Sequence, residues 1–343
     1  MTTLHEHLEG WAGASAGRRS LAATVAAVAG AAVELAAVVA QGPIDGDPGA
    51  VLGASADGDG QKALDVQAHA IFLRRLAEAP VSAVVSEEAP DILALRPDAP
   101  FAVALDPLDG SNNIDANAPM GTVFSVLPSD RTDDPALAFA SPGERQLAAG
   151  FVLYGPYTSL ALTLGQGVDV FTLDPRTGGF RLTRPKLRVP EARREYAING
   201  SNARHWPLPV RAFVEECIAG SAGPRGVDYN TRWLGCVVAE AYRILLRGGI
   251  YLYPGDGRRG YERGRLRLLY EASPLAFLFE QAGGAATDGF VRILDIVPAD
   301  IHQRVPLIFG SRDKVERVVE LHASGVPQAG QRPLFSARGL FRS

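Results

Sequence analysis

Acidic residues follow three apolar segments of this chain, and no other feature of the sequence constrains its fold as strongly. They are Glu87 and Glu88 after residues 81–85, Asp106 and Asp109 after residues 101–105, and Glu271 after residues 266–270. Short apolar segments of this kind predict buried β-strands. Because α/β proteins build their sites at strand ends, we expect these carboxylates to lie together. Carboxylates that converge on one point repel one another unless cations lie between them, so the pattern predicts a metal site.

Strands and helices alternate along both halves of the chain, which predicts an α/β protein with layered sheets and helices. Further strands are expected over residues 122–127, 147–153, 159–163, 168–174, 180–183, 195–199, 249–253 and 306–309, and helices over 18–41, 62–79, 209–217, 234–246, 274–282 and 314–322. A charged stretch with two prolines, residues 184–194, marks a domain boundary. We therefore expect a flexible N-terminus over 1–17, domains over 18–187 and 188–323, and an appended tail over 324–343.

Composition narrows the class of protein. With 343 residues, of which 47% are hydrophobic and 21% charged, the chain can bury a substantial core. A net charge of −4 gives no basic excess for nucleic acid, so phosphate groups must be bound locally by metal ions, arginines and backbone N–H groups. Two cysteines without a Cys-x-x-Cys pair predict neither disulfides nor a zinc motif, and favour a cytoplasmic location.

The apolar segment 21–40 raises the question of a membrane anchor or signal. It consists mostly of alanine, which drives membrane insertion little, and Glu34 interrupts it. We therefore expect a buried or interface helix, with no membrane as partner.

The turn at Asp106-Pro-Leu-Asp-Gly has the residues that a metal site requires. Pro107 fixes the backbone so that Asp106, the Leu108 carbonyl and Asp109 can face one cation, and Gly110 permits close approach of the backbone. Residues 111–112 can begin a helix or turn whose N–H groups face a phosphate. The alternative is an ordinary turn in which Asp109 caps a helix.

The ten residues Asp106-Pro-Leu-Asp-Gly-Ser-Asn-Asn-Ile-Asp115 resemble the signature of class I fructose-1,6-bisphosphatases. The wider superfamily of lithium-sensitive phosphatases shares only the shorter core of this string. Other matching segments are 57–65, 85–88, 121–124, 248–254, 266–271 and 300–304, so the resemblance covers about residues 20–320. It implies a layered αβαβα sandwich of the sugar phosphatase type, with the metal site in the first domain and the sugar phosphate bound by the second.

The resemblance also implies the roles of single residues. The implied metal ligands, for two or three Mg²⁺ ions with Mn²⁺ as a substitute, are Glu87, Glu88, Asp106, the Leu108 carbonyl, Asp109 and Glu271. The implied catalytic residues are Asp65, Glu87 and Asp59; Asp59 and Asp65 lie on a loop that closes over the site, and Asp65 orients or deprotonates the attacking water. The implied substrate-binding residues are Asp109, Gly110, Ser111, Asn112, Asn199, Arg232, Trp233, Tyr253 and Arg265. Members of the family are homotetramers in which the residue corresponding to Arg232 reaches a neighbouring subunit.

The implied reaction is hydrolysis of fructose 1,6-bisphosphate to fructose 6-phosphate and phosphate, in gluconeogenesis or the Calvin cycle. Several differences from the family pattern affect which sugar the chain is expected to bind. Asn112 replaces a serine, Arg265 replaces a lysine, and Asn202 and Trp233 replace two tyrosines. They leave sedoheptulose 1,7-bisphosphate open as a second substrate, and an inositol-phosphatase-like enzyme or a catalytically inactive binding protein as further alternatives.

Two further features concern inhibition by AMP and the role of three arginines. Residues 17–20 and 100–101 lack the pattern of AMP-inhibited members, so we expect weak or no inhibition by AMP. For Arg258, Arg259 and Arg263, solvation and phosphate contact remain equal alternatives.

Overall fold

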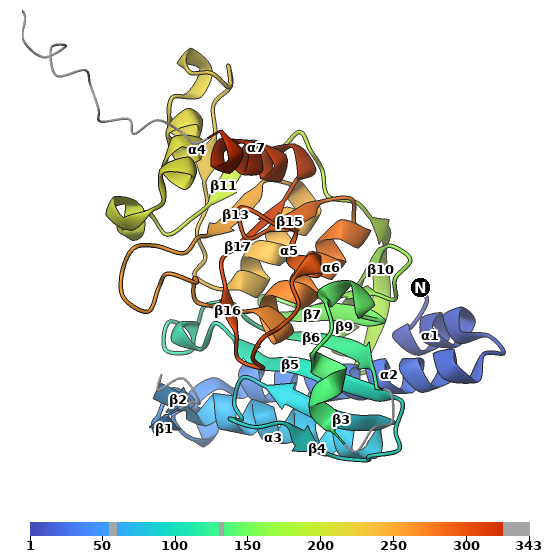
Figure 1. The fold of residues 1–343 in the computed structure, drawn as a ribbon. Coiled ribbons are helices and arrows are strands. Elements are labelled where there is room, and N and C mark those ends of the chain that lie inside the picture. The colour runs from blue at the N-terminus through green and yellow to red at the C-terminus, as the bar shows by residue number, and fades with distance from the viewer. Residues whose placement is uncertain (55–59, 130–133, 325–343) are drawn as a thin grey trace, which may run out of the picture.

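Two β-sheets alternate with three layers of helices, so the described part of the chain has the predicted order α, β, α, β, α (Figure 1). The computed structural model describes residues 1–54, 60–129 and 134–324. One apolar core lies between the outer helices and the larger sheet, a second surrounds the middle helices between the two sheets, and a third lies under the helices outside the smaller sheet. All strands of the larger sheet precede residue 188, and all strands of the smaller sheet follow residue 194.

The larger sheet has eight strands in the order β10-β9-β8-β7-β6-β5-β3-β4. Their bounds are β3 (Val81–Ser86), β4 (Leu93–Ala94), β5 (Phe101–Asp109), β6 (Met120–Pro128), β7 (Ala148–Tyr154), β8 (Thr158–Thr163), β9 (Val168–Asp174) and β10 (Gly179–Leu187). β3 and β5 are parallel and buried along their whole length, which explains their continuous apolar sequences. Because they run in the same direction, their carboxyl ends meet at one edge, and the acidic residues meet there too.

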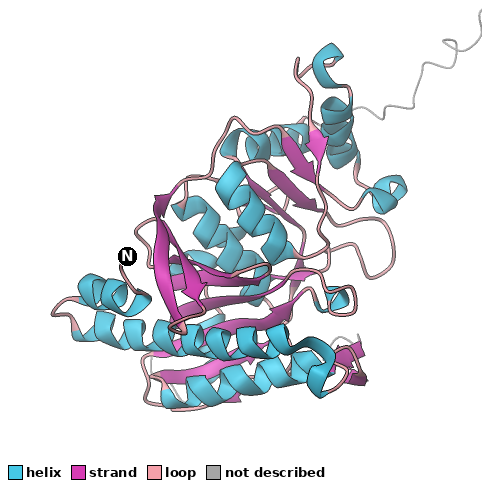
Figure 2. Ribbon diagram, turned by 180° about the vertical axis from the view of Figure 1, so that it is seen from behind, coloured by secondary structure: helices cyan, strands magenta, loops and turns pink. Residues whose placement is uncertain are grey.

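Three helices, α1 (Leu4–Ala12), α2 (Ala16–Gln41) and α3 (Ala63–Glu78), cover the outer face of this sheet (Figure 2). The part of α2 that packs on the sheet includes Leu21, Val25, Val28, Ala32 and Leu35, which recur at helical spacing. By length and composition, residues 16–45 could span a membrane: an 18-residue window within them has a mean hydropathy of 2.0, but 44% of that window is buried in the fold. α2 is therefore a core helix with a partly uncovered side.

The N-terminus is helical, and the prediction of a flexible segment over residues 1–17 is wrong. Thr3 caps α1: its side chain accepts a hydrogen bond from the Glu6 N–H, and the Glu6 carboxylate accepts one from the Thr3 N–H. Leu4 and Leu8, four residues apart, are buried against the rest of the fold. The capping pair and the i, i+4 spacing of the two leucines indicate a helix, but they are short patterns followed by a stretch of mostly Gly, Ala and Ser.

The smaller sheet has the order β12-β11-β13-β17-β15 and forms the C-terminal half (Figure 1). Its strands are β11 (Glu195–Ala197), β12 (Asn230–Thr231), β13 (Ile250–Tyr253), β15 (Ala285–Thr287) and β17 (Leu307–Gly310). α5 (Val237–Arg247) and α6 (Ser273–Gln281) lie between the two sheets, and α4 (Leu208–Ile218) and α7 (Arg312–Ala323) cover the outer face. Two small ladders complete the described structure: β1 (Val51–Ala54) with β2 (Gly60–Lys62), and β14 (Leu266–Arg267) with β16 (Arg304–Val305).

Candidate active site

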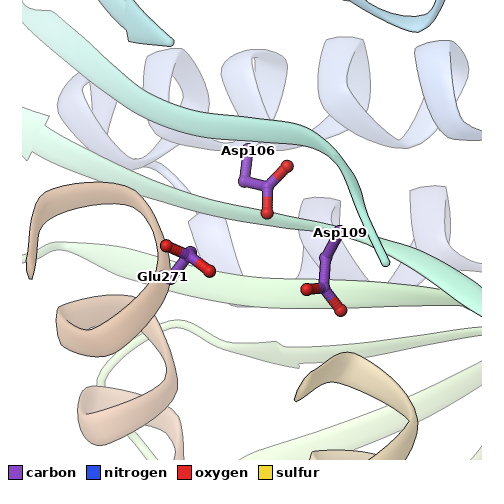
Figure 3. Close-up of side chains that lie close together, drawn as sticks. All are labelled: Asp106, Asp109 and Glu271. Carbon is purple, nitrogen blue, oxygen red and sulfur yellow. The ribbon is translucent and has the colours of Figure 1, made fainter. Parts of the chain in front are cut away.

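Three buried carboxylates converge where β5 ends beside the middle helical layer (Figure 3). They belong to Asp106, Asp109 and Glu271, and one oxygen of each lies within 4.8 Å of the others. The sequence predicts that these residues meet, and the structure brings them together. Oxygen atoms at this spacing can share a divalent cation.

A bulge at the end of β5 turns both aspartates to the same side. Asp106 pairs with Val123 on β6, whereas Asp109 pairs with Gly121, so three steps along β5 oppose two steps along β6. Without the extra residue, side chains three positions apart would point to opposite faces of the sheet. The Asp106 Oδ1 atom accepts a hydrogen bond from the Leu108 N–H at 3.0 Å, which fixes the turn. Leu108 lies inside this bulge.

Glu271 reaches the site from a π-helical turn, Leu268–Ala272, and not from a strand as the apolar segment 266–270 predicted. Only Leu266–Arg267 is a strand, and the chain then widens into the π-turn that leads to α6. Extra residues in a turn of this kind often mark functional sites, because they project a side chain that a regular helix would not. The Arg267 N–H donates to the Glu271 Oε2 atom at 2.6 Å and holds the carboxylate in place.

Arg267 is a site residue that sequence reasoning missed. Its side chain is buried, and its Nη1 atom lies 3.4 Å from the Glu87 Oε1 atom. A buried guanidinium beside several carboxylates offsets part of their negative charge. The sequence shows Arg267 four residues before Glu271, but the π-turn between them decides that both side chains reach the same site.

The electrostatics of the cluster favour protonated carboxyls over bare carboxylates. Burial, reinforced by the neighbouring acidic groups, raises the pKa of Glu87 and of Asp106 well above their ordinary values. Burial likewise raises the pKa of Asp109 and of Glu88, and raises the pKa of Glu271 to about 7. These carboxyls are therefore difficult to ionise together without a cation.

The donor set fits a hard divalent cation such as Mg²⁺. The buried Asp106 Oδ2 atom accepts no hydrogen bond from the described residues, so its lone pairs can serve a metal ion. All side-chain donors in the cluster are oxygens, the ligand type that Mg²⁺ prefers. Glu88 lies at the edge, where its carboxylate accepts a hydrogen bond from the Gln61 side chain.

Asp65 lies in the first turn of α3, and the prediction that it belongs to a closing loop is wrong. Its Oδ2 atom accepts a hydrogen bond from the Lys62 N–H at 2.8 Å, as an acidic residue at a helix start can do. The buried Oδ1 atom has no hydrogen-bond partner in the described parts of the chain. Burial raises the pKa of Asp65 to about 6. The other predicted catalytic residue of this segment, Asp59, lies outside the described residues.

The segment after Asp109 forms a short 3₁₀ helix, Ser111–Asn113, which agrees with the predicted helix or turn. Gly110 has φ +82°, a left-handed conformation that favours glycine, and it packs against Cys236. Asn112 is exposed. The Lys62 Nζ atom donates to the Ser111 carbonyl oxygen at 3.1 Å and ties this turn to the start of α3.

Several predicted sugar-binding residues lie at or just after the carboxyl ends of the parallel strands β11, β12 and β13. Asn199 and Tyr253 line one pocket together with Asn202. Trp233 stacks on Tyr251, with ring centroids 5.9 Å apart, and lies next to Tyr253. Arg265 lies beside this pocket, where its Nη1 atom donates to the hydroxyl of Tyr261.

Arg232 is not directed into this pocket within the single chain. Its side chain is half-exposed, and its Nε atom lies 3.7 Å from the Glu195 Oε1 atom. The structure thus brings Asn199, Tyr253 and Arg265 together and leaves Arg232 on an accessible surface.

Cys236 is a second site residue that sequence reasoning missed. Its Sγ atom donates to the Asp109 Oδ2 atom at 2.8 Å, and the Val238 N–H donates to the same oxygen at 3.0 Å. Asp109 therefore caps the start of α5 from 127 residues away, and the same carboxylate belongs to the convergent group. No local pattern in the sequence could have indicated this contact.

We predict that Cys236→Ala raises the Mg²⁺ concentration needed for half-maximal activity about tenfold. Loss of a partner that orients a metal ligand typically lowers metal affinity by at least this factor. Cys236→Ser keeps a hydrogen-bond donor and should stay close to the wild type. Activity measured against Mg²⁺ concentration tests both variants, and Cys217→Ala, which removes a buried thiol within α4, is the matched control. Equal behaviour of the alanine and serine variants at position 236 would contradict the role of the donor.

Comparison with known proteins places this site in a family. Residues 23–185 match the family described as "Fructose-1-6-bisphosphatase, N-terminal domain", and residues 189–323 match its "C-terminal domain". A class 1 fructose-1,6-bisphosphatase of Rhodopseudomonas palustris is 54% identical over 96% of this chain and 96% of that protein. One from Nitrobacter hamburgensis is 52% identical over 99% of this chain and 98% of its own length.

The fold agrees with these sequences. The crystal structure of Leishmania major fructose-1,6-bisphosphatase in holo form superposes with a TM-score of 0.87 at 33% identity, covering 94% of this chain and 99% of the other. The chain therefore belongs to the class 1 fructose-1,6-bisphosphatases, and its activity is that of a hydrolase of carbohydrate metabolism acting on fructose 1,6-bisphosphate.

Proposed function

We propose that the enzyme removes the 1-phosphate of fructose 1,6-bisphosphate at a site that holds two or three Mg²⁺ ions. The ligands in this proposal are Glu87, Glu88, Asp106, the Leu108 carbonyl, Asp109 and Glu271. The observation that carries it is the buried group Asp106, Asp109 and Glu271, whose oxygens converge within 4.8 Å. Bound Mg²⁺ would neutralise the phosphate and make a bound water more acidic, and Mn²⁺, which takes similar oxygen ligands, is expected to replace it.

The side chains of this site have separate tasks. Asp65, with its pKa raised to about 6 and one oxygen without a partner, is suited to accept a proton from the attacking water. Glu87 is the second candidate for this role. Asp59, which lies outside the described residues, is a further proposed catalytic residue. The N–H groups of Gly110 and Ser111, with Asn112 beside them, would hold the phosphate oxygens. Arg267 keeps Glu87 and Glu271 in place.

For the sugar, the proposal puts the distal phosphate near Asn199, Tyr253 and Arg265, with Trp233 beside them. Asn202 also lines this pocket and is smaller than the tyrosine of the family pattern. This observation favours sedoheptulose 1,7-bisphosphate as a second substrate, because a longer sugar needs additional room.

Steady-state kinetics on the two bisphosphates test this proposal. With Mg²⁺ or Mn²⁺ present we expect phosphate release from fructose 1,6-bisphosphate, with a measurable but lower kcat/KM for sedoheptulose 1,7-bisphosphate. Chelation of the metal should remove both activities. Tight binding of the sugars without turnover would instead support a catalytically inactive binding protein.

Assembly and location belong to the same proposal. α2 is strongly apolar, yet less than half of its most apolar window is buried within one chain, so we infer that further copies cover it in a homotetramer. Arg232, half-exposed beside Glu195, would then be free to serve a neighbouring subunit. Two free, buried cysteines agree with a cytoplasmic location. Membership of the family supports a role in gluconeogenesis. We propose a role in the Calvin cycle in addition.

A further inference from the structure

The segment between β13 and β14 places a tyrosine against two arginines at the pocket that Asn199 and Tyr253 line. The guanidinium carbons of Arg258 and Arg265 lie 4.2 and 5.1 Å from the ring centroid of Tyr261. The Arg265 Nη1 atom also donates to the Tyr261 hydroxyl at 2.9 Å. Cation–π contacts of this length stabilise the ring, so Tyr261 has a defined position although it lies on a connecting segment.

The backbone and Asp256 hold this arrangement in shape. The Tyr261 N–H donates to the Arg258 carbonyl oxygen at 2.9 Å, and the Asp256 N–H donates to the Tyr261 carbonyl oxygen at 3.0 Å. The Asp256 carboxylate binds the Nε and Nη2 atoms of Arg258. The guanidinium of Arg258 is thereby oriented before any ligand arrives, and pre-orientation lowers the entropic cost of binding.

Tyr261 and Arg258 line the same pocket as Asn199, Asn202 and Tyr253. A phenol that accepts a hydrogen bond still has its own proton to donate, so the Tyr261 hydroxyl can donate to an anion while Arg265 donates to it. Arginine and hydroxyl donors at one point are the chemistry that binds a phosphate monoester. The structure also separates two neighbours that the sequence left equivalent: Arg258 lines the pocket, whereas Arg259 is exposed.

We propose that Tyr261 is a specificity-determining residue whose hydroxyl donates to the distal phosphate of the sugar bisphosphate, with Arg258 and Arg265 holding its ring. This inference rests on the proposed placement of the distal phosphate in the pocket of Asn199 and Tyr253. It assigns a function to the segment 254–265 and supplies a phenolic hydroxyl to a pocket in which Asn202 and Trp233 stand where family tyrosines would.

Tyr261→Phe tests the hydroxyl alone, because phenylalanine keeps the ring against both guanidinium groups. We expect its KM for fructose 1,6-bisphosphate to rise about tenfold with little change in kcat, since a hydrogen bond to a charged group is lost from binding. Turnover of fructose 1-phosphate, which has no distal phosphate, should stay as in the wild type. Arg258→Ala should raise the KM for the bisphosphate at least as much, and Arg259→Ala is the matched control that removes an exposed charge from the same segment.

Calorimetric titration with fructose 6-phosphate provides a readout that needs no catalysis and therefore separates this inference from the proposed metal chemistry. The dissociation constant should rise about tenfold in Tyr261→Phe and stay unchanged in Arg259→Ala. Wild-type affinity of Tyr261→Phe for fructose 6-phosphate would overturn the proposal. So would an equal loss of kcat/KM on fructose 1-phosphate and the bisphosphate, because a general disturbance of the site would then explain the effect.

Discussion

Asp109→Asn is expected to lower kcat for phosphate release by at least about 10³-fold, the scale on which preorganised charge at a reacting group acts. Asp109 both accepts hydrogen bonds from the start of α5 and belongs to the group of converging carboxylates. One of its oxygens is held by Cys236 and the Val238 N–H, and its carboxylate belongs to the convergent group with Asp106 and Glu271. An amide oxygen can still accept the two hydrogen bonds, so the substitution removes the charge with little change of shape.

The stability of this variant should move in the opposite direction. Because burial disfavours the ionised carboxylate, the neutral amide should leave the metal-free protein as stable as the wild type or more stable at neutral pH. Asp98→Asn is the matched control, since Asp98 is exposed on the turn before the same strand and its loss should affect neither quantity. Near wild-type turnover of Asp109→Asn, with the fold intact by circular dichroism, would reject Asp109 as a metal ligand.

The parts of this site that the sequence could predict are those determined by burial. The segments 81–85 and 101–105 are continuous apolar runs because β3 and β5 are buried on both faces, and such runs can be recognised without a structure. Their acidic ends were therefore predictable as neighbours. The resemblance to a known family then supplied the sugar-binding positions, which no spacing rule could have connected.

The remaining features depend on irregular backbone or on distant contacts. The bulge in β5 that turns Asp106 and Asp109 to one side leaves no separate mark in an apolar strand. The π-turn at Leu268–Ala272 has the composition of a strand, so Glu271 was predicted at the right place for a wrong reason. Cys236 meets Asp109 across 127 residues of chain, a contact that only the tertiary fold creates.

The second large effect concerns the stability of the metal-free enzyme, which is expected to fall as the pH rises from about 4 to about 7. Burial raises the pKa of Glu271 to about 7 and that of Asp65 to about 6, whereas both groups have ordinary acidic values in the unfolded chain. Between these limits the folded state holds protons that the unfolded state has already released, so each step up in pH favours unfolding. For Glu271 alone the loss is about 3 kcal/mol, since one pKa unit corresponds to about 1.4 kcal/mol.

Mg²⁺ should reverse this loss, and most strongly where the loss is largest. A ligand that binds only the folded state stabilises it by about 2.7 kcal/mol at a hundred times its dissociation constant, and these carboxyls must be ionised to bind a metal. Thermal unfolding of chelator-treated protein at about pH 5 and about pH 7.5, with and without Mg²⁺, measures both effects. We expect a large upward shift of the unfolding midpoint with Mg²⁺ at the higher pH and little shift at the lower pH. In Asp109→Asn the Mg²⁺ shift should largely disappear; a pH-independent Mg²⁺ effect would mean that the ion binds elsewhere, because only the buried cluster couples its binding to these protons.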